Sequence, residues 1–319
     1  MQLEESLHGS VRVTKAGSVL ADLAGGLADV DNGIACTPST PFQVASVSKQ
    51  FTAAALMLLV ESGSLDLNEP VDRWLLDASP QWKQVTLHHL LSHTAGIPHW
   101  REAPGLDPAE PMGIGERLAH IQAAPLRSEP GARWHYSSPG YLLAGFIAER
   151  AGGQPYRELL ATLILSPLGL TQTTVGAMPP GAALGYKGAD PVVAFDLDAM
   201  PGTGDVWSTA SDLTKFTNAL HQGELVSPSL LHAMCSAQVG LADDDGDPWL
   251  ITTGYGYGMY TGIFGGHPTL YHPGDNPGYK SFACWLPDQE TSVVMLLNDE
   301  TTDIKSLLRQ LLPLTWEPQ

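Results

Sequence analysis

The stretch that most constrains this chain is an apolar segment of helical periodicity that begins at Ser46 and stops at Ser62-Gly63. Apolar residues recur along it three and four positions apart and leave hardly any polar face. A helix that is apolar nearly all round must be covered on every side by other parts of the protein. We therefore expect this helix to lie at the centre of a globular fold.

Ser46 and Lys49 stand three residues apart at the start of this helix, so their side chains share one face. A hydroxyl becomes a useful nucleophile when a nearby base takes its proton, and a partly desolvated lysine can be that base. The helix N-terminus adds unpaired amides and a dipole that favour a negative charge beside Ser46. A chain of 319 residues contains one Ser-x-x-Lys by chance about as often as not, so the pair alone could also be a solvated helix face.

The charge balance excludes several classes of partner. The chain has 34 Asp and Glu against 16 Lys and Arg, for a formal net charge of -18. Binding to nucleic acid or to an anionic membrane surface is therefore not expected. The first eight residues lack the basic and apolar regions of a signal peptide, and the longest apolar run, residues 53–60, is too short for membrane insertion. We expect a cytoplasmic protein, or a secreted one if a leader was removed ahead of this numbering.

Strand-like patterns occur near both ends of the chain, and helical patterns lie between them. Strands are expected at residues 11–15, 17–23, 255–260, 270–272, 281–286 and 292–297, with an irregular turn at 272–278, a hairpin turn at 287–290 and a final helix at 303–312. We predict an α+β fold, with a mostly antiparallel sheet flanked by helices. The sheet domain would comprise residues 1–66 and 200–319, with a mainly helical domain inserted at 67–199.

A second notable segment precedes a helix that starts near residue 138. Ser138 followed by Pro139 is typical of an N-cap and first-turn pair, which explains Ser138 structurally. Tyr136 has no such explanation, because it lies on the loop before the helix, where a phenol can point into a cleft. A buried aromatic side chain is the commoner role for a tyrosine taken alone.

Other polar clusters favour structural roles. The four histidines between residues 88 and 99 lack zinc-ligand spacing and a nearby acidic partner, so we expect them to be structural or solvent-facing. The acidic run at residues 243–247 departs from a calcium loop and is interpreted as a solvated loop. The three cysteines are odd in number and widely spaced, so we expect buried thiols rather than a disulfide framework. No metal or organic cofactor is implied.

Three short motifs follow one another along the chain: Ser-x-x-Lys at residues 46–49, Tyr-Ser-Ser at 136–138 and His-Pro-Gly at 272–274. Together they resemble the motifs of the serine β-lactamase and penicillin-binding-protein superfamily. The chain is most similar to the class C branch, which includes D,D-carboxypeptidases, family VIII esterases and D-amino-acid peptidases, from about residue 26 to residue 298. The resemblance implies a β-lactamase/transpeptidase-like fold with the site in a crevice between the sheet and the helical domain.

The resemblance also implies roles for the motif residues. Ser46 is expected to be the nucleophile, Lys49 and Tyr136 to share its proton, and His272 to act from the opposite wall. They would catalyse acyl transfer through an acyl-enzyme that is released to water or another acceptor. The backbone amides of Ser46 and Asp275 would form the oxyanion hole, where loss of one donor typically costs about 10²–10³ in rate.

The residues expected to bind substrate depart from the family pattern. His272 stands where β-lactamases usually have Lys, which weakens the fixed positive charge that would hold a substrate carboxylate. Ser138 replaces the usual Asn, whose amide would contact an acyl side chain. Asp275 follows Gly274 where a small neutral residue would suit an anionic ligand better. An efficient β-lactamase is therefore not expected.

We predict a serine hydrolase, either an esterase or an amidase/peptidase, that acts on a small ester, amide or short peptide. Asp275 motivates D-amino-acid substrates as a narrower option. The alternative is a penicillin-binding-like protein that is catalytically weak or inactive and serves to bind a ligand or as a scaffold. No pattern in the chain specifies an oligomeric state.

Overall fold

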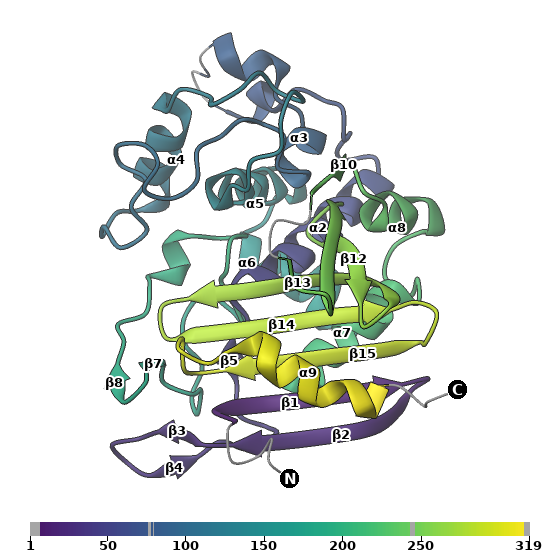
Figure 1. The fold of residues 1–319 in the computed structure, drawn as a ribbon. Coiled ribbons are helices and arrows are strands. Elements are labelled where there is room, and N and C mark those ends of the chain that lie inside the picture. The colour runs from purple at the N-terminus through teal and green to yellow at the C-terminus, as the bar shows by residue number, and fades with distance from the viewer. Residues whose placement is uncertain (1–6, 76–77, 79, 243–245, 316–319) are drawn as a thin grey trace.

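The computed structural model describes residues 7–75, 78, 80–242 and 246–315, and Figure 1 shows their arrangement. Within these residues, a large sheet has the order β10-β11-β12-β13-β14-β15-β1-β2, with every neighbouring pair antiparallel. Its strands are β1 (Gly9–Lys15), β2 (Ser18–Gly25), β10 (Val239–Gly240), β11 (Leu250–Tyr255), β12 (Tyr260–Phe264), β13 (His267–Asn276), β14 (Tyr279–Leu286) and β15 (Thr291–Leu297). Both ends of the chain supply neighbouring strands, and the predicted α+β class is confirmed.

Helices and short strands surround this sheet. The helices are α2 (Ser48–Glu61), α3 (Leu87–Leu91), α4 (Ile114–Ala123), α5 (Ser138–Gly152), α6 (Tyr156–Leu160), α7 (Ala210–His221), α8 (Pro228–Cys235) and α9 (Ile304–Thr315). Short helical turns are η1 (Ala45–Val47), η2 (Val71–Trp74), η3 (Pro80–Gln84), η4 (Ala161–Leu165) and η5 (Leu197–Ala199). The short strands are β3 (Leu27–Asp29), β4 (Ile34–Ala35), β5 (Phe42–Gln43), β6 (Thr174–Val175), β7 (Tyr186–Lys187), β8 (Asp190–Pro191) and β9 (Val206–Ser208).

Helix α2 lies in the interior, because nearly all of its side chains are buried. Phe51 of α2 stacks on Phe216 of α7, with 3.7 Å between the ring centroids. The helix ends at Glu61, directly before the predicted Ser-Gly stop. The prediction of a central helix is confirmed, with one refinement: Ser46 lies on the separate turn η1, two residues before the α-helix begins.

The large sheet packs on both of its faces. One face joins α2, α5 and α7 in the larger hydrophobic core. The other face is covered by α9, whose Leu307, Leu308 and Leu311 belong to a second core with β1 and β14 (Figure 1). Side chains along a strand alternate between the two faces of a sheet, and both faces are covered here, so β15 is buried along its whole length. This burial explains its apolar run at residues 293–297.

Three local expectations are wrong, and a fourth falls mostly outside the described residues. The strand expected at residues 255–260 is instead the connection between β11, which ends at Tyr255, and β12, which begins at Tyr260. The irregular turn expected at residues 272–278 is wrong, because β13 continues to Asn276 and stays paired with β14 up to Tyr279. The helix cap expected at Ser138 is supplied instead by Ser137, whose Oγ accepts from the amide of Gly140 at 3.1 Å. Most of the acidic run, residues 243–245, lies outside the described residues.

The proposed division at residues 67 and 199 stays a prediction. The interval holds the segments from η2 to η4 that make up most of the helical layer at the top of Figure 1. It also holds β6, β7 and β8, of which β6 pairs with β9 beyond the expected boundary.

A close approach between β13 and η1 fixes the position of the nucleophile turn against the sheet. Gly274 lies where an added Cβ would meet the Ser281 Oγ and would stand 2.6 Å from the carbonyl oxygen of Val44. The Ser281 hydroxyl donates to that same carbonyl at 2.6 Å. Only a residue without a side chain leaves room for this contact.

We expect Gly274→Ala to push β13 away from η1 and to lower the free energy of unfolding by about 1–3 kcal/mol, as overpacking does in other cores. Urea denaturation followed by circular dichroism measures this change. Gly240→Ala is the matched control, since no atom lies within 4 Å of its added Cβ. Equal stabilities of the two variants would contradict the steric role of Gly274.

Candidate active site

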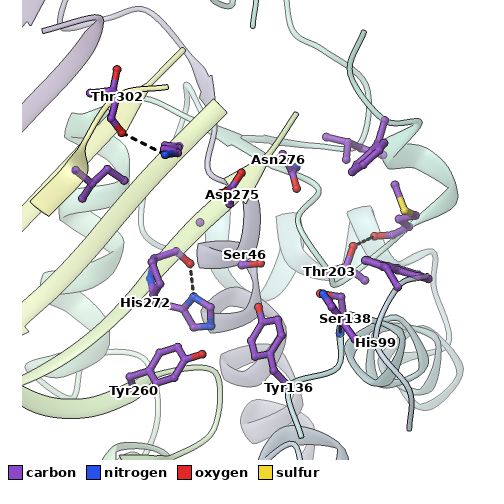
Figure 2. Close-up of a pocket in the computed structure, with 18 of the residues that line it drawn as sticks. Ser46, His99, Tyr136, Ser138, Thr203, Tyr260, His272, Asp275, Asn276 and Thr302 are labelled. Atoms are coloured by element: carbon purple, nitrogen blue, oxygen red, sulfur yellow. Dashed lines mark hydrogen bonds between the residues drawn. The ribbon is translucent and has the colours of Figure 1, made fainter. Parts of the chain in front are cut away.

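Ser46 sits on a strained turn that joins β5 to α2. Ala45, directly before it, has φ of 46°, a left-handed conformation that costs a residue other than glycine about 1–3 kcal/mol. Val206 of β9 holds the turn on both sides: its carbonyl accepts from the Val44 amide at 2.9 Å, and its amide donates to the Ser48 Oγ at 3.0 Å. The turn presents a half-buried Ser46 to the cleft shown in Figure 2.

Lys49 is fully buried next to Ser46. Its Nζ lies 3.0 Å from the Ser46 Oγ and donates to the carbonyl oxygen of Thr203 at 2.6 Å. Burial lowers the pKa of Lys49 from 10.5 to about 7, while the nearby Asp205 carboxylate acts in the opposite direction. A lysine that loses its proton near neutral pH can accept a proton from the Ser46 hydroxyl.

Tyr136 lies on the loop before α5, as the sequence predicted. Its phenol lies close enough to the Ser46 and Ser138 side chains for both to act on its pKa, and its ring centroid is 5.1 Å from the Lys49 Nζ. Burial raises the pKa of Tyr136 above its ordinary value of 10, so the phenol keeps its proton at neutral pH. Of the two groups expected to share the Ser46 proton, Lys49 therefore has the pKa of a base and Tyr136 that of a proton donor.

His272 is buried on β13, and Figure 2 shows it across Tyr136 from Ser138. Its Nδ1 donates to the carbonyl oxygen of Pro273 at 2.6 Å, so its Nε2 accepts from the Tyr255 hydroxyl at 3.2 Å. Burial, and secondarily the charge of Lys49, lower the pKa of His272 to about 3. The ring is therefore neutral and fixed in place, and it supplies no positive charge where a family lysine would.

The cleft has a volume of about 570 Å³. One wall is the edge of β13 beyond Tyr271, where the pairing with β12 ends and no other strand among the described residues takes its place. Asp275 on this edge is exposed, and within the described residues no ion pair engages its carboxylate. Partial desolvation raises the pKa of Asp275, and the neighbouring Lys280 opposes this effect.

The structure brings the predicted residues together. Those that line the cleft are Ser46, Tyr136, Ser138, His272, Gly274 and Asp275. Lys49 lies directly behind Ser46. Three separated parts of the chain thus meet at one hydroxyl.

Two residues beside Lys49 were missed by the sequence reasoning. Thr203 contributes its backbone oxygen, and no side-chain pattern could reveal that contact. Asp205 is buried, and burial raises its pKa to about 7. The sequence did contain a signal for Asp205, because it is a single Asp between Gly204 and an apolar strand. A carboxylate is rarely buried at such a position unless it has a functional or electrostatic role.

Two of the four histidines that the sequence assigned to structural or solvent-facing roles, His93 and His99, lie at this site. His88 bonds to the Tyr257 hydroxyl at 2.7 Å, and His93 is buried among aromatic rings, 4.4 Å from that of Tyr136. His99 lines the cleft itself. Among the residues described, no group of three or more His, Cys, Asp or Glu side chains is arranged to hold a metal ion, and the three cysteines are unpaired.

Comparison with known proteins gives this arrangement its family. The Beta-lactamase family model matches residues 3–312, almost the entire chain. The chain belongs to the beta-lactamase family. Among solved structures it is similar to the octameric penicillin-binding protein homologue from Pyrococcus abyssi, with a TM-score of 0.84, 27% identity and coverage of 96% of this chain and 72% of that one.

Two further members of the beta-lactamase family have enzymatic names. The D-amino acid amidase from Ochrobactrum anthropi SV3 superposes with a TM-score of 0.83 at 27% identity, over 95% of this chain and 94% of the amidase. Esterase EstB from Burkholderia gladioli is 35% identical over 59% of this chain and 52% of the esterase. None of the helices in the described part of the chain has the length and apolarity needed to cross a membrane.

The state of Lys49 predicts how activity depends on pH. For a neutral ester, we expect kcat/KM to rise with pH through about 7 and then level off, because Lys49 must lose its proton to act as a base. His272 and His99, with pKa values of about 3 and about 4, add no further change between pH 5 and 8. A pH–rate profile without a rise near 7 would contradict this role.

Asp205→Asn provides the companion measurement. It removes the negative charge that raises the pKa of Lys49, so we expect the rise in kcat/KM to move to lower pH. Because Lys49 and Asp205 both titrate near pH 7 in the parent protein, the observed midpoint belongs to the pair. An unchanged midpoint in this variant would show that the Asp205 charge does not affect the pKa of Lys49.

Proposed function

We propose that this chain is a serine hydrolase that forms an acyl-enzyme on Ser46 with small ester or amide substrates. The observation that carries the proposal is the 3.0 Å contact between the Ser46 Oγ and a buried Lys49 whose pKa is about 7. A hydroxyl, a base within hydrogen-bond distance and an open cleft in front of them are what acyl transfer requires. An esterase and a D-amino acid amidase in the same family support this class of chemistry.

In the proposed reaction, neutral Lys49 takes the Ser46 proton as the Oγ bonds to the substrate carbonyl carbon. The carbonyl π electrons move onto its oxygen, which the backbone amides of Ser46 and Asp275 would stabilise. When the carbonyl re-forms, the bond to the leaving group breaks, and that group takes a proton from Tyr136, which Lys49 re-protonates. Water then attacks the acyl-enzyme along the reverse proton path and releases the acid.

The charges of the cleft favour neutral or amine-bearing substrates. Asp275 offers a carboxylate on the open edge of β13, and His272 is neutral where a cation would hold a substrate carboxylate. Lys280 and Lys305 line the same cleft, but Lys280 donates to the carbonyl oxygen of Thr302 at 3.2 Å and the Lys305 Nζ lies 3.8 Å from the Asp247 carboxylate. Asp303 adds a second carboxylate to the lining. An ammonium group beside Asp275 would therefore find an anionic partner, as a D-amino-acid amide would supply.

A covalent label tests the acyl-enzyme proposal directly. We expect a fluorophosphonate probe to add one label to the protein in intact mass spectrometry, and Ser46→Ala to abolish the adduct. Ser64→Ala, on an exposed serine just beyond α2, is the matched control and keeps the label. Absence of an adduct together with no turnover over a panel of esters and amides would favour the binding or scaffold alternative.

Asp275→Asn tests the amine preference. We expect this variant to raise KM for D-phenylalaninamide about 1.4- to fivefold, because an exposed ion pair contributes about 0.2–1 kcal/mol. KM for 3-phenylpropanamide, which has the same skeleton without the amine, stays the same. Equal changes for the two amides would show that Asp275 does not recognise an ammonium group.

A further inference from the structure

The cleft wall next to Ser138 is mostly apolar. Its apolar side chains are Trp100, Phe195, Leu197 and Met200. Two polar side chains on this wall are buried: the Thr203 hydroxyl donates to the carbonyl oxygen of Met200 at 2.9 Å, and Ser138 is only 5% exposed and lies near the Tyr136 phenol. Thr203 could orient a substrate only by giving up its internal bond.

His99 on the same wall differs, because one of its ring nitrogens is left over. The Ser138 amide donates to the His99 Nδ1 at 3.1 Å, so Nδ1 carries no proton and the neutral ring carries its proton on Nε2. Burial lowers the pKa of His99 to about 4, with Lys49 contributing, and the ring stays neutral at pH 7. Nε2 has no partner in the part of the chain that the structure describes.

His99 also stands close to the reacting hydroxyl. Its ring contacts that of Tyr136 edge-on, with 5.4 Å between centroids, and the Tyr136 phenol lies near the Ser46 side chain. Figure 2 shows His99 beside Ser138, on the side of Tyr136 away from His272. An acyl group on Ser46 that extends along this wall would meet an apolar surface with an N–H donor in it.

We propose that the His99 Nε2–H binds an acceptor oxygen in the acyl part of the substrate, a few atoms from the scissile carbonyl. The preferred acyl group is then largely apolar and carries one ketone or amide oxygen, because apolar pockets orient ligands with a few fixed polar groups. This inference rests on the proposed acyl-enzyme at Ser46. The proposal also explains how Ser138 can replace the usual Asn. His99, which lies beside Ser138, supplies an N–H donor in place of the Asn amide.

Two matched esters and two histidine variants test the proposal by turnover. The p-nitrophenyl esters of 4-oxopentanoic and 4-methylpentanoic acid differ by an oxygen in place of a methyl group. In His99→Asn, the Asn Oδ1 can replace Nδ1 as acceptor for Ser138, but the Nε2 donor is lost. We expect the ratio of kcat/KM for the oxo ester to that for the methyl ester to fall about three- to tenfold, the value of one hydrogen bond.

Controls separate a lost donor from a disturbed wall. His99→Gln can keep an N–H near the Nε2 position, so we expect it to retain the preference for the oxo ester. His135→Asn makes the same chemical change on the Tyr136 loop, where the ring bonds to Glu102 and does not line the cleft, and it leaves the ratio unchanged. The two esters differ in intrinsic reactivity, but this difference is the same for every variant and therefore does not affect the comparison of their ratios. A ratio that stays the same in His99→Asn, including one that stays the same because kcat/KM falls equally for both esters, would overturn the proposal.

Binding decides the same point without turnover. NMR titration of Ser46→Ala with the methyl esters of the same two acids gives their relative dissociation constants. We expect a preference for the oxo ester that disappears when His99→Asn is added, and equal affinities before that change would overturn the inference. Failure of the proposed function shows separately, as absence of the Ser46 adduct and of ester turnover.

Discussion

The Lys49 amine lies between the Ser46 hydroxyl and the Thr203 carbonyl, out of reach of water. Lowering the pKa of an ammonium group from 10.5 to about 7 corresponds to about 5 kcal/mol of destabilisation of its charged form. Such an environment exists only where helices and sheet enclose the group completely. The buried position of α2, with packing on all sides, is therefore as much a requirement of the base as of the hydrophobic core.

The geometry in front of this amine depends on two backbone positions with positive φ. Ala45 turns the chain so that Ser46 faces the cleft, and His93, with φ of 58°, turns toward the Tyr136 loop. The His93 carbonyl accepts from the amide of residue 135 at 2.8 Å, and its Nδ1 accepts from the Ser137 amide at 3.1 Å. These two bonds bracket Tyr136. Both strained residues are buried, so the surrounding packing compensates for their conformational cost.

Much of the fold and the site was predictable from local patterns. Runs of β-forming residues, a tight turn and a hairpin signal located β1, β2, β14 and β15, and three ordered motifs selected the residues that meet at the cleft. The errors came from local signals that tertiary pairing overrode. Proline and glycine at residues 273–278 indicate a turn, yet pairing with β14 keeps β13 extended to Asn276. The cap of α5 was misplaced for a different reason. Two serines are adjacent there, so the sequence pattern does not distinguish Ser137, which caps the helix, from Ser138.

The sequence by itself determined the parts that depend on residue type and near neighbours in the chain. These are the apolar period of α2, the Ser46–Lys49 spacing and the absence of a lysine at residue 272. Tertiary structure alone decided which groups change protonation and which donors face the cleft. The low pKa of Lys49 and the tautomer of His99 arise from burial and from single hydrogen bonds to distant residues. Desolvation and hydrogen bonding act through space, so the order of residues along the chain does not encode them on its own.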